Sequence, residues 1–94
     1  MEMKISLEQL LDSTANCEIV ENLAGQNRMT VKDFCEKNGL KRYRVTKRER
    51  YFCERGMRYN YFHFFLYAPD KAWIHRHHNS QNGVPVVQIE ELPL

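Results

Sequence analysis

Helix-capping residues at both ends of one short segment constrain the fold of this chain more than any other feature. Thr30 is followed three residues later by Asp33, an arrangement in which the threonine side chain caps the start of a helix. Gly39 stands where a helix closes in the left-handed conformation, and Leu40 follows where an apolar side chain packs back onto the last turn. These residues predict a helix over residues 31–38.

The segment that follows, residues 41–55, is compatible with either a helix or a strand. As a helix, it directs Val45 and Phe52 inward and places Lys41, Arg44, Arg48 and Arg55 along one outer face. As a strand, it places Arg44, Arg48 and Arg50 on one face and Tyr43, Val45, Tyr51 and Cys53 on the other. Both conformations cluster the arginines, so we expect a basic surface in either case.

The first third of the chain carries weaker helix signals. Ser6 and Gln9 form a capping box, which predicts a helix beginning near residue 7. Polar residues after it compete for backbone hydrogen bonds, and the later apolar residues drift off its face. We therefore expect two short helices or one kinked helix, and then a loop over residues 24–28.

The last third predicts strands. Residues 58–67 and 72–78 are dense in aromatic residues, and Pro69 and Asp70 between them suit the centre of a turn, which predicts an antiparallel hairpin. A second turn at 79–83 leads to a strand over residues 84–90. That strand should lie at a sheet edge, because Pro85 has no amide hydrogen to donate.

Together these elements predict a single α+β domain over residues 1–94. Short N-terminal helices precede a three-stranded antiparallel meander, which gives a winged-helix-like arrangement if residues 41–55 are helical. If they are extended, a fourth strand at about 43–53 replaces the second helix.

Composition and targeting features point to one small domain in the cytoplasm. Ninety-four residues, 43% of them apolar, suffice for one modest core. No apolar run is long enough to span a membrane, and the start of the chain lacks the features of a signal peptide. Three cysteines without a CxxC pair favour neither a disulfide framework nor a zinc ribbon.

Charge is distributed unevenly along the chain. The net charge is only +2, yet residues 26–58 hold eleven Lys and Arg against four Asp and Glu. A basic middle third in a nearly neutral chain is typical of a protein that presents a cationic face to an anionic partner. Seven cations are the candidate nucleic-acid contacts: Lys41, Arg42, Arg44, Lys47, Arg48, Arg50 and Arg55.

The order of residues after Met29 resembles a helix-turn-helix. The predicted helix TVKDFCEKN is followed by the turn glycine Gly39, apolar Leu40 and apolar Val45. The amino-acid sequence of residues 30–40 is similar to that of transposase-associated and phage DNA-binding regulators. The resemblance covers residues 30–50 only. It implies that a second helix enters a major groove, with five of the cations divided between bases and phosphates. The C-terminal hairpin would then act as a wing.

Aromatic residues and histidines supply two further candidate sites. An aromatic sheet face that also carries cations can stack unpaired bases, although such residues more often form the core. His63 together with His75, His77 and His78 raises metal binding as an alternative, but no complete ligand motif accompanies them. We expect neither a metal nor another cofactor.

The sequence therefore predicts a small nucleic-acid-binding regulator, encoded by a phage or mobile element, that contacts DNA or RNA through residues 41–58. One alternative is a small inhibitor or adaptor, such as a viral antagonist of a host defence enzyme, that binds an acidic or nucleic-acid-binding protein surface. A second alternative is a small ribonuclease-type toxin that uses a histidine as general acid or base. We do not expect the protein to be an enzyme. The partners that the sequence allows include a second copy of the chain, as a homodimer.

Overall fold

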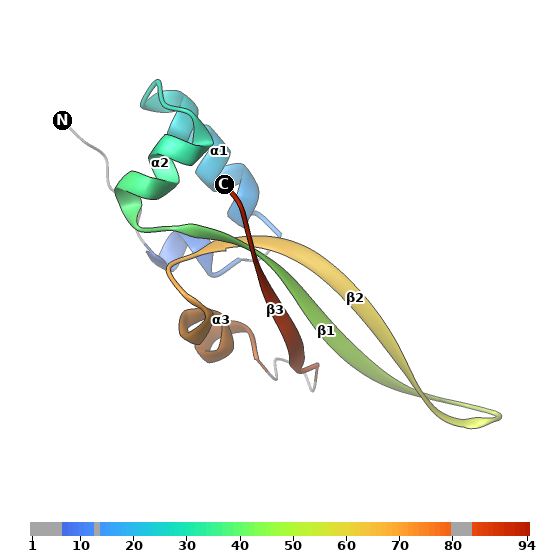
Figure 1. The fold of residues 1–94 in the computed structure, drawn as a ribbon. Coiled ribbons are helices and arrows are strands. Elements are labelled where there is room, and N and C mark those ends of the chain that lie inside the picture. The colour runs from blue at the N-terminus through green and yellow to red at the C-terminus, as the bar shows by residue number, and fades with distance from the viewer. Residues whose placement is uncertain (1–6, 13, 80–83) are drawn as a thin grey trace.

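The computed structural model describes residues 7–12, 14–79 and 84–94 of the chain (Figure 1). Its elements are the 3-10 helix η1 (Leu7–Leu10), α1 (Asn16–Gln26), α2 (Val31–Asn38), β1 (Lys41–Cys53), β2 (Gly56–Ala68), α3 (Lys71–His78) and β3 (Val86–Leu92). The three strands form one antiparallel sheet in the order β2-β1-β3. This confirms the α+β class and the three-stranded antiparallel sheet.

The capped helix predicted over residues 31–38 is α2, with the same bounds. The Thr30 side chain accepts a hydrogen bond from the Asp33 amide at 3.1 Å. Gly39 closes the helix with a φ of 68°, and the Leu40 amide donates to the Cys35 carbonyl at 2.8 Å. Local chemistry alone was therefore sufficient to define this helix.

Residues 41–53 form β1, which is the strand alternative. The second helix of a helix-turn-helix, and with it the winged-helix-like arrangement, is not formed. The physical reason is pairing: β1 is the central strand, hydrogen-bonded to β2 along its whole length and to β3 as far as Lys47. Tyr43, Val45 and Thr46 suit this position, because aromatic and β-branched side chains pack well on a pleated surface.

Residues 71–78 form α3, so the strand predicted over 72–78 is wrong. Asp70 is the N-cap of this helix rather than part of a turn between strands, since its carboxylate accepts a hydrogen bond from the Trp73 amide at 2.7 Å. Trp73, Ile74 and His78 lie on one side of the helix and are buried. The true partner of β2 is β1, and β3 pairs with β1 rather than following β2 as in a meander.

The remaining predictions have mixed outcomes. Two short N-terminal helices form as expected, but α1 continues to Gln26, so the predicted loop begins later than residue 24. The third predicted strand is β3, and it lies at a sheet edge as expected. The capping box at Ser6 and Gln9 and most of the turn at 79–83 fall outside the residues whose side chains are described.

The core lies at one end of an elongated molecule, whose extents are 58 × 23 × 21 Å. On one sheet face, here called the core face, Tyr43, Val45 and Leu66 are fully buried beside α3. On the opposite face, α1 and α2 cover only the end of the sheet near Tyr67, while β1 and β2 continue outward as a two-stranded hairpin (Figure 1). Most of this hairpin is therefore left exposed.

Candidate nucleic-acid interface

Strand register brings four arginines and a row of rings onto one face of the hairpin. Arg42, Arg44, Arg48 and Arg50 alternate along β1, and the residues directly opposite them on β2 are Tyr67, Phe65, Tyr61 and Tyr59, in that order. Directly opposed residues of an antiparallel pair point to the same side of a sheet. We call this side, together with the Thr46 and His63 rung at its middle, the arginine face.

Two of the arginines stack on rings of the neighbouring strand. The Arg48 guanidinium lies 4.6 Å from the centre of the Tyr59 ring, and that of Arg42 lies 4.9 Å from the centre of the Phe65 ring. Both contacts are diagonal, one rung away from the directly opposed pair. Such cation–π contacts stabilise a ribbon and also hold the guanidinium in place before any ligand arrives.

A polar rung lies at the middle of the arginine face. A hydrogen bond of 2.7 Å joins the Thr46 hydroxyl to Nδ1 of His63. Thr46 is buried whereas His63 is exposed, so the rung presents the histidine ring to solvent. His63 therefore belongs to the exposed row of rings on β2.

Free positive charge is concentrated in the part of the hairpin beyond residue 47. Arg44 forms an ion pair with Glu90 of β3, which neutralises much of its charge. Within the described part of the chain, no carboxylate lies within ion-pair distance of Arg48 or Arg50. Glu49, between these two arginines, points to the opposite face. Arg48 and Arg50 are thus available to an external anion.

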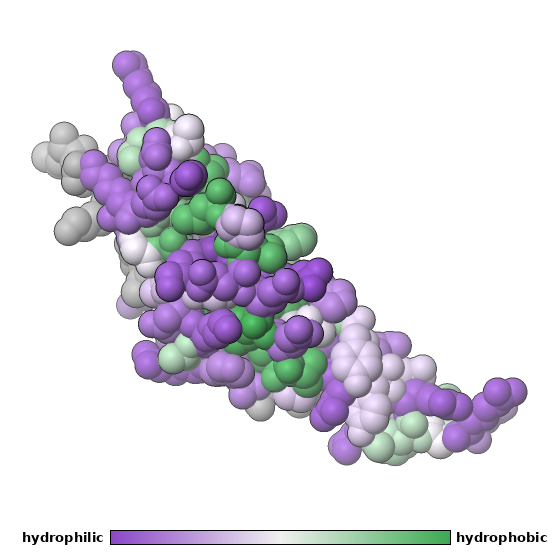
Figure 2. Space-filling view, viewed as in Figure 1, coloured by the Kyte–Doolittle hydropathy of each residue, from purple (hydrophilic) through white to green (hydrophobic). Residues whose placement is uncertain are grey.

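A small hollow adjoins these two arginines. It measures about 240 Å³ and is lined by Arg48, Arg50, Tyr59 and Pro85. Figure 2 shows hydrophilic and nearly neutral side chains alternating over the projecting hairpin, without one continuous hydrophobic patch. The arginine face therefore combines charge, aromatic surface and a recess.

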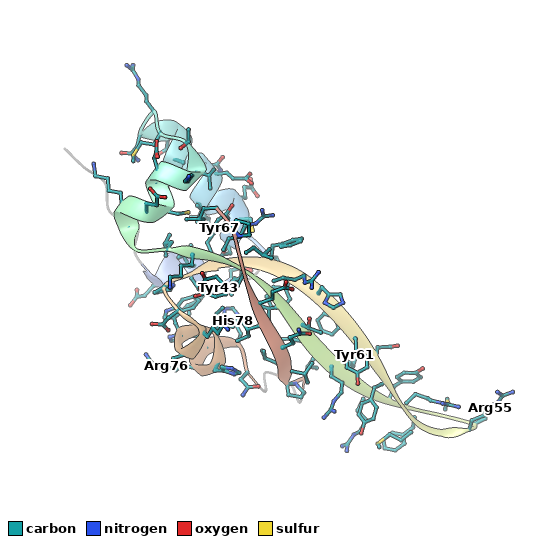
Figure 3. The ribbon with its side chains drawn as sticks, in the orientation of Figure 1. Tyr43, Arg55, Tyr61, Tyr67, Arg76 and His78 are labelled. Atoms are coloured by element: carbon teal, nitrogen blue, oxygen red, sulfur yellow. The ribbon has the colours of Figure 1, made fainter. Side chains whose placement is uncertain are left out.

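The hairpin ends in a tight turn that carries another cation. Arg55 lies at this tip, far from the helices (Figure 3). Gly56 follows with a φ of 103°, a conformation that a side chain disfavours. Arg55 is exposed and extends the cationic surface to the end of the hairpin.

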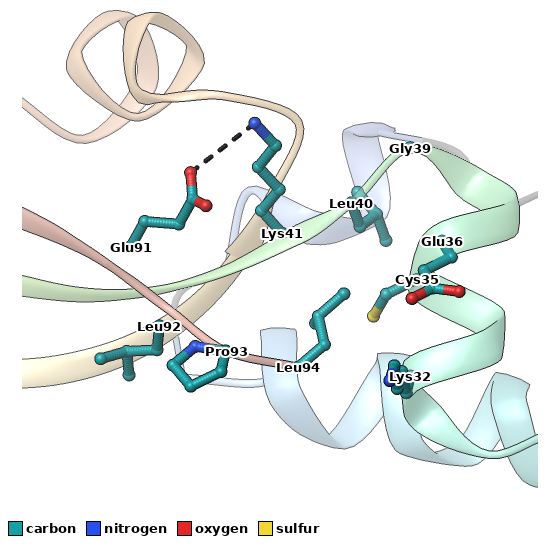
Figure 4. A pocket seen from close by; sticks show the side chains of 10 residues that line it. All are labelled: Lys32, Cys35, Glu36, Gly39, Leu40, Lys41, Glu91, Leu92, Pro93 and Leu94. Carbon is teal, nitrogen blue, oxygen red and sulfur yellow. Dashed lines mark ion pairs between the residues drawn. The ribbon is translucent and has the colours of Figure 1, made fainter.

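Two of the seven predicted cations lie elsewhere. The Lys41 ammonium is 3.6 Å from the Glu91 carboxylate, beside a hollow of about 520 Å³ between α2 and the C-terminal residues (Figure 4). Lys47 lies on the core face, where it is buried, and this burial lowers the pKa of its ammonium group. The structure therefore brings together Arg42, Arg44, Arg48 and Arg50, adds Arg55 at the tip, and separates both lysines from them.

The histidines do not converge. His63 lies on the arginine face, whereas His75, His77 and His78 belong to α3, on the side of the core face. His78 is buried beside Trp73 and Phe64, and burial lowers its pKa, with smaller contributions from Lys47 and His77. Among the described residues, no three metal-ligating side chains are grouped.

The sequence identified the arginines but gave the aromatic strand the wrong partner. Residues 58–67 were predicted to pair with residues 72–78, which form α3, whereas the structure pairs them with β1, beside the arginines. Gly56 is the sequence signal that indicates the correct pairing. It ends the tight turn between two strands of thirteen residues each, β1 and β2.

Comparison of the chain with protein-family models, with curated proteins and with solved structures finds no match. No helix in the described ranges has the length and apolar character needed to cross a membrane.

Proposed function

We propose that this protein is a small nucleic-acid-binding regulator that contacts its ligand through the arginine face of the hairpin. The observation that carries the proposal is the pair Arg48 and Arg50, which have no carboxylate partner in the described chain and lie beside Tyr59 and Tyr61 on a projecting ribbon. The proposal also assigns the protein to the cytoplasm, where its three free cysteines would stay reduced.

The chemistry of these residues suits a polyanion. A guanidinium group matches a phosphate geometrically, since two of its N–H groups can donate to two phosphate oxygens at once. Arginines at alternate positions of a strand are about 6.7 Å apart, so Arg48 and Arg50 can contact neighbouring phosphates of one backbone. A two-stranded ribbon is also narrow enough to enter a major groove about 12 Å wide.

Salt dependence gives the most direct test. Fluorescence anisotropy with labelled duplex and single-stranded oligonucleotides should show binding that weakens steeply as salt increases. The double variant Arg48→Ala and Arg50→Ala should reduce the slope of log K against log salt by about 1.4 for single strands and about 1.8 for duplex, because two phosphate contacts are lost.

A matched control removes the same charge elsewhere. Lys32 on α2 and Arg76 on α3 are exposed cations away from the arginine face. The double variant Lys32→Ala and Arg76→Ala should leave the slope nearly unchanged. Equal losses in the two double variants would show that net charge, rather than this face, drives binding, and absence of binding at low salt would overturn the proposal.

A protein partner is the second candidate function, and the exposure of the hairpin favours it. Phe52 is 76% exposed near the tip, and Tyr51 and Phe62 are exposed on the core-face side of the same ribbon. Aromatic residues of this kind anchor protein interfaces. An inhibitor or adaptor would fail to bind oligonucleotides at low salt, yet bind a host protein in a manner that Phe52→Ser weakens. Light scattering on the isolated protein would detect a homodimer.

A further inference from the structure

We propose that the arginine face selects unpaired nucleotides, with bases stacked on the β2 rings Tyr59, Tyr61 and Phe65 and phosphates held by Arg48 and Arg50. This inference rests on the proposed function and narrows its ligand to single-stranded nucleic acid. The hairpin would act as a platform along which a strand lies, rather than as a probe inserted into a groove.

Duplexes and single strands offer different parts of each base to a protein. In a duplex the flat faces of the bases are covered by stacking, and the grooves display only base edges. In a single strand the faces are free, and aromatic side chains bind them with little regard to sequence. The arginine face offers rings to solvent, since Tyr61 is 59% exposed and Phe65 is 45% exposed. Exposed rings match the ligand that has exposed base faces.

The spacing of the rings on β2 also suits a single strand. Tyr59, Tyr61, His63 and Phe65 occupy alternate positions of β2, so the backbone positions that carry neighbouring rings are about 6.7 Å apart along the strand. Stacked bases are separated by about 3.4 Å, so a base placed between two rings needs about 6.8 Å. The row therefore has the repeat required to alternate rings with bases of an extended strand.

The arginines lie beside the rings, on the neighbouring strand. Arg48 is directly opposite Tyr61 and Arg50 is directly opposite Tyr59, so each ring has a guanidinium beside it across the ladder. A strand lying along the ribbon can then direct its bases toward β2 and its phosphates toward β1. The hollow of about 240 Å³ lined by Arg48, Arg50 and Tyr59 offers guanidinium groups for a phosphate and a ring for a base at one place.

The three β2 rings differ in how much of their surface is free to stack on a base. Arg48 already lies over the Tyr59 ring and Arg42 over the Phe65 ring, which leaves one face of each for a base. No arginine or lysine in the described chain stacks on Tyr61, which lies between Tyr59 and Phe65 and is more exposed than either. Tyr61 is therefore the residue whose loss should reveal stacking most clearly.

The test compares Tyr61→Leu with Phe62→Leu. Both variants remove one exposed ring from neighbouring positions of β2, but Phe62 points to the opposite side of the ribbon. Anisotropy titrations would use a labelled 20-nucleotide DNA strand of mixed sequence, the same strand as RNA, and the DNA strand annealed to its complement, all at one salt concentration. Circular dichroism would confirm that both variants are folded.

We expect the wild-type protein to bind single strands at least tenfold more tightly than duplex. Tyr61→Leu should weaken single-strand binding by about 5- to 150-fold, the range expected for one lost base–aromatic stack, and change duplex binding less than twofold. Phe62→Leu should have less than a twofold effect on either ligand. A difference between the DNA and RNA strands would show whether the sugar hydroxyl is also contacted.

Two outcomes would overturn the inference in distinguishable ways. Duplex binding that equals or exceeds single-strand binding, with the salt slope still reduced in the Arg48 and Arg50 double variant, would leave the proposed function standing and reject single-strand selection. Equal losses in Tyr61→Leu and Phe62→Leu would reject stacking on the arginine face. Absence of binding to all three probes would reject the inference together with the proposed function.

Discussion

The two halves of the hairpin share one hydrogen-bonded ladder but differ in everything that surrounds it. In the proximal half, residues 41–47 and 62–68, β1 also pairs with β3, and Tyr43, Val45 and Leu66 are fully buried in the core. In the distal half, residues 48–61, the described strands pair only with each other beyond the Arg48 amide, which donates to the Pro85 carbonyl at 3.1 Å.

This difference assigns stability to the proximal half and leaves the distal half for the recognition proposed above. An isolated two-stranded hairpin is marginally stable in water, so the distal half depends on the proximal half to fold. In return, the distal half is free to expose side chains that a core could not accommodate. If the division holds, substitutions in the proximal half should cost more stability than substitutions in the distal half.

Leu66→Ala should cause the largest loss, because it removes a fully buried side chain from the proximal half. The free energy of unfolding, measured by chemical denaturation, should fall by about 2–5 kcal/mol. Phe52→Ala, in the distal half, removes a larger side chain that is mostly exposed and should change this free energy by only about 0.5 kcal/mol. Similar losses in the two variants would contradict the division.

Asn16 provides the second test, because it ties α1 to the outer edge of β2. Its side-chain amide donates to the Tyr67 carbonyl at 3.0 Å and to the Leu10 carbonyl at 3.1 Å, and its carbonyl accepts from the Tyr67 amide at 2.7 Å. Asn16 thus replaces a neighbouring strand at this point of the edge.

Asn16→Ala leaves these buried backbone groups without partners, which should lower the free energy of unfolding by about 1–3 kcal/mol. Asn60→Ala, on the exposed distal part of the same strand, is the matched control and should have little effect. A small loss in Asn16→Ala would show that solvent can replace the amide and that this edge needs no protection.

Capping chemistry explains how much of the fold the sequence predicts. Thr30 and Gly39 act on their immediate neighbours, so α2 could be assigned without knowledge of the rest of the molecule. Asp70 is an equally local cap, yet it was assigned to a turn because Pro69 precedes it and aromatic residues follow. The prediction went wrong where two local interpretations competed and only burial of Trp73 and Ile74 decides between them.

The candidate site shows the same limit. Alternation places Arg44, Arg48 and Arg50 on one face of a strand, and this part of the prediction is confirmed. That Tyr61 and Tyr59 lie opposite two of these arginines depends on which strand pairs with β1, and pairing is a long-range property. Lys47 was predicted as a contact because it is a cation in a basic run, and its burial could not be seen in the sequence.

Lowering the pH should destabilise the folded protein through His78 of α3, which packs beside Phe64 of the proximal half. Burial lowers the pKa of His78 below 6.5, its ordinary value, so the unfolded chain binds a proton more readily than the folded one. The free energy of unfolding should therefore fall as the pH decreases below 6.5 and continue to fall until the folded-state pKa is passed. Lys47 and His77 also lower the pKa of His78, because they disfavour a positive charge on its ring.

Denaturation curves of the wild type, His78→Gln and His75→Gln between pH 5 and 8 would test this expectation. His78→Gln should flatten the pH dependence, whereas His75→Gln, an exposed position on the same helix, should preserve it. Unchanged pH dependence in His78→Gln would assign the effect to other groups.

The smallest expected effect lies in the distal half. There, contacts between side chains of the two strands replace burial as the source of stability. Arg48 lies 4.6 Å from the centre of the Tyr59 ring, and this contact joins the two strands of the ribbon. A double-mutant cycle with Arg48→Gln and Tyr59→Leu should give a coupling energy of about 0.5–1 kcal/mol. We expect the distal half to open without global unfolding, so amide hydrogen exchange over residues 48–61 is the appropriate measurement.

Coupling near zero would mean that the distal ladder is held by its backbone hydrogen bonds alone. The Arg48 guanidinium would then be mobile, and a phosphate would have to immobilise it on binding, at a cost in side-chain entropy. Coupling in the expected range would mean that Arg48 is already held in place. The same stacking contact would then stabilise the free hairpin and prepare it to bind an anion, so the smallest effect bears most directly on the recognition proposed for the distal half.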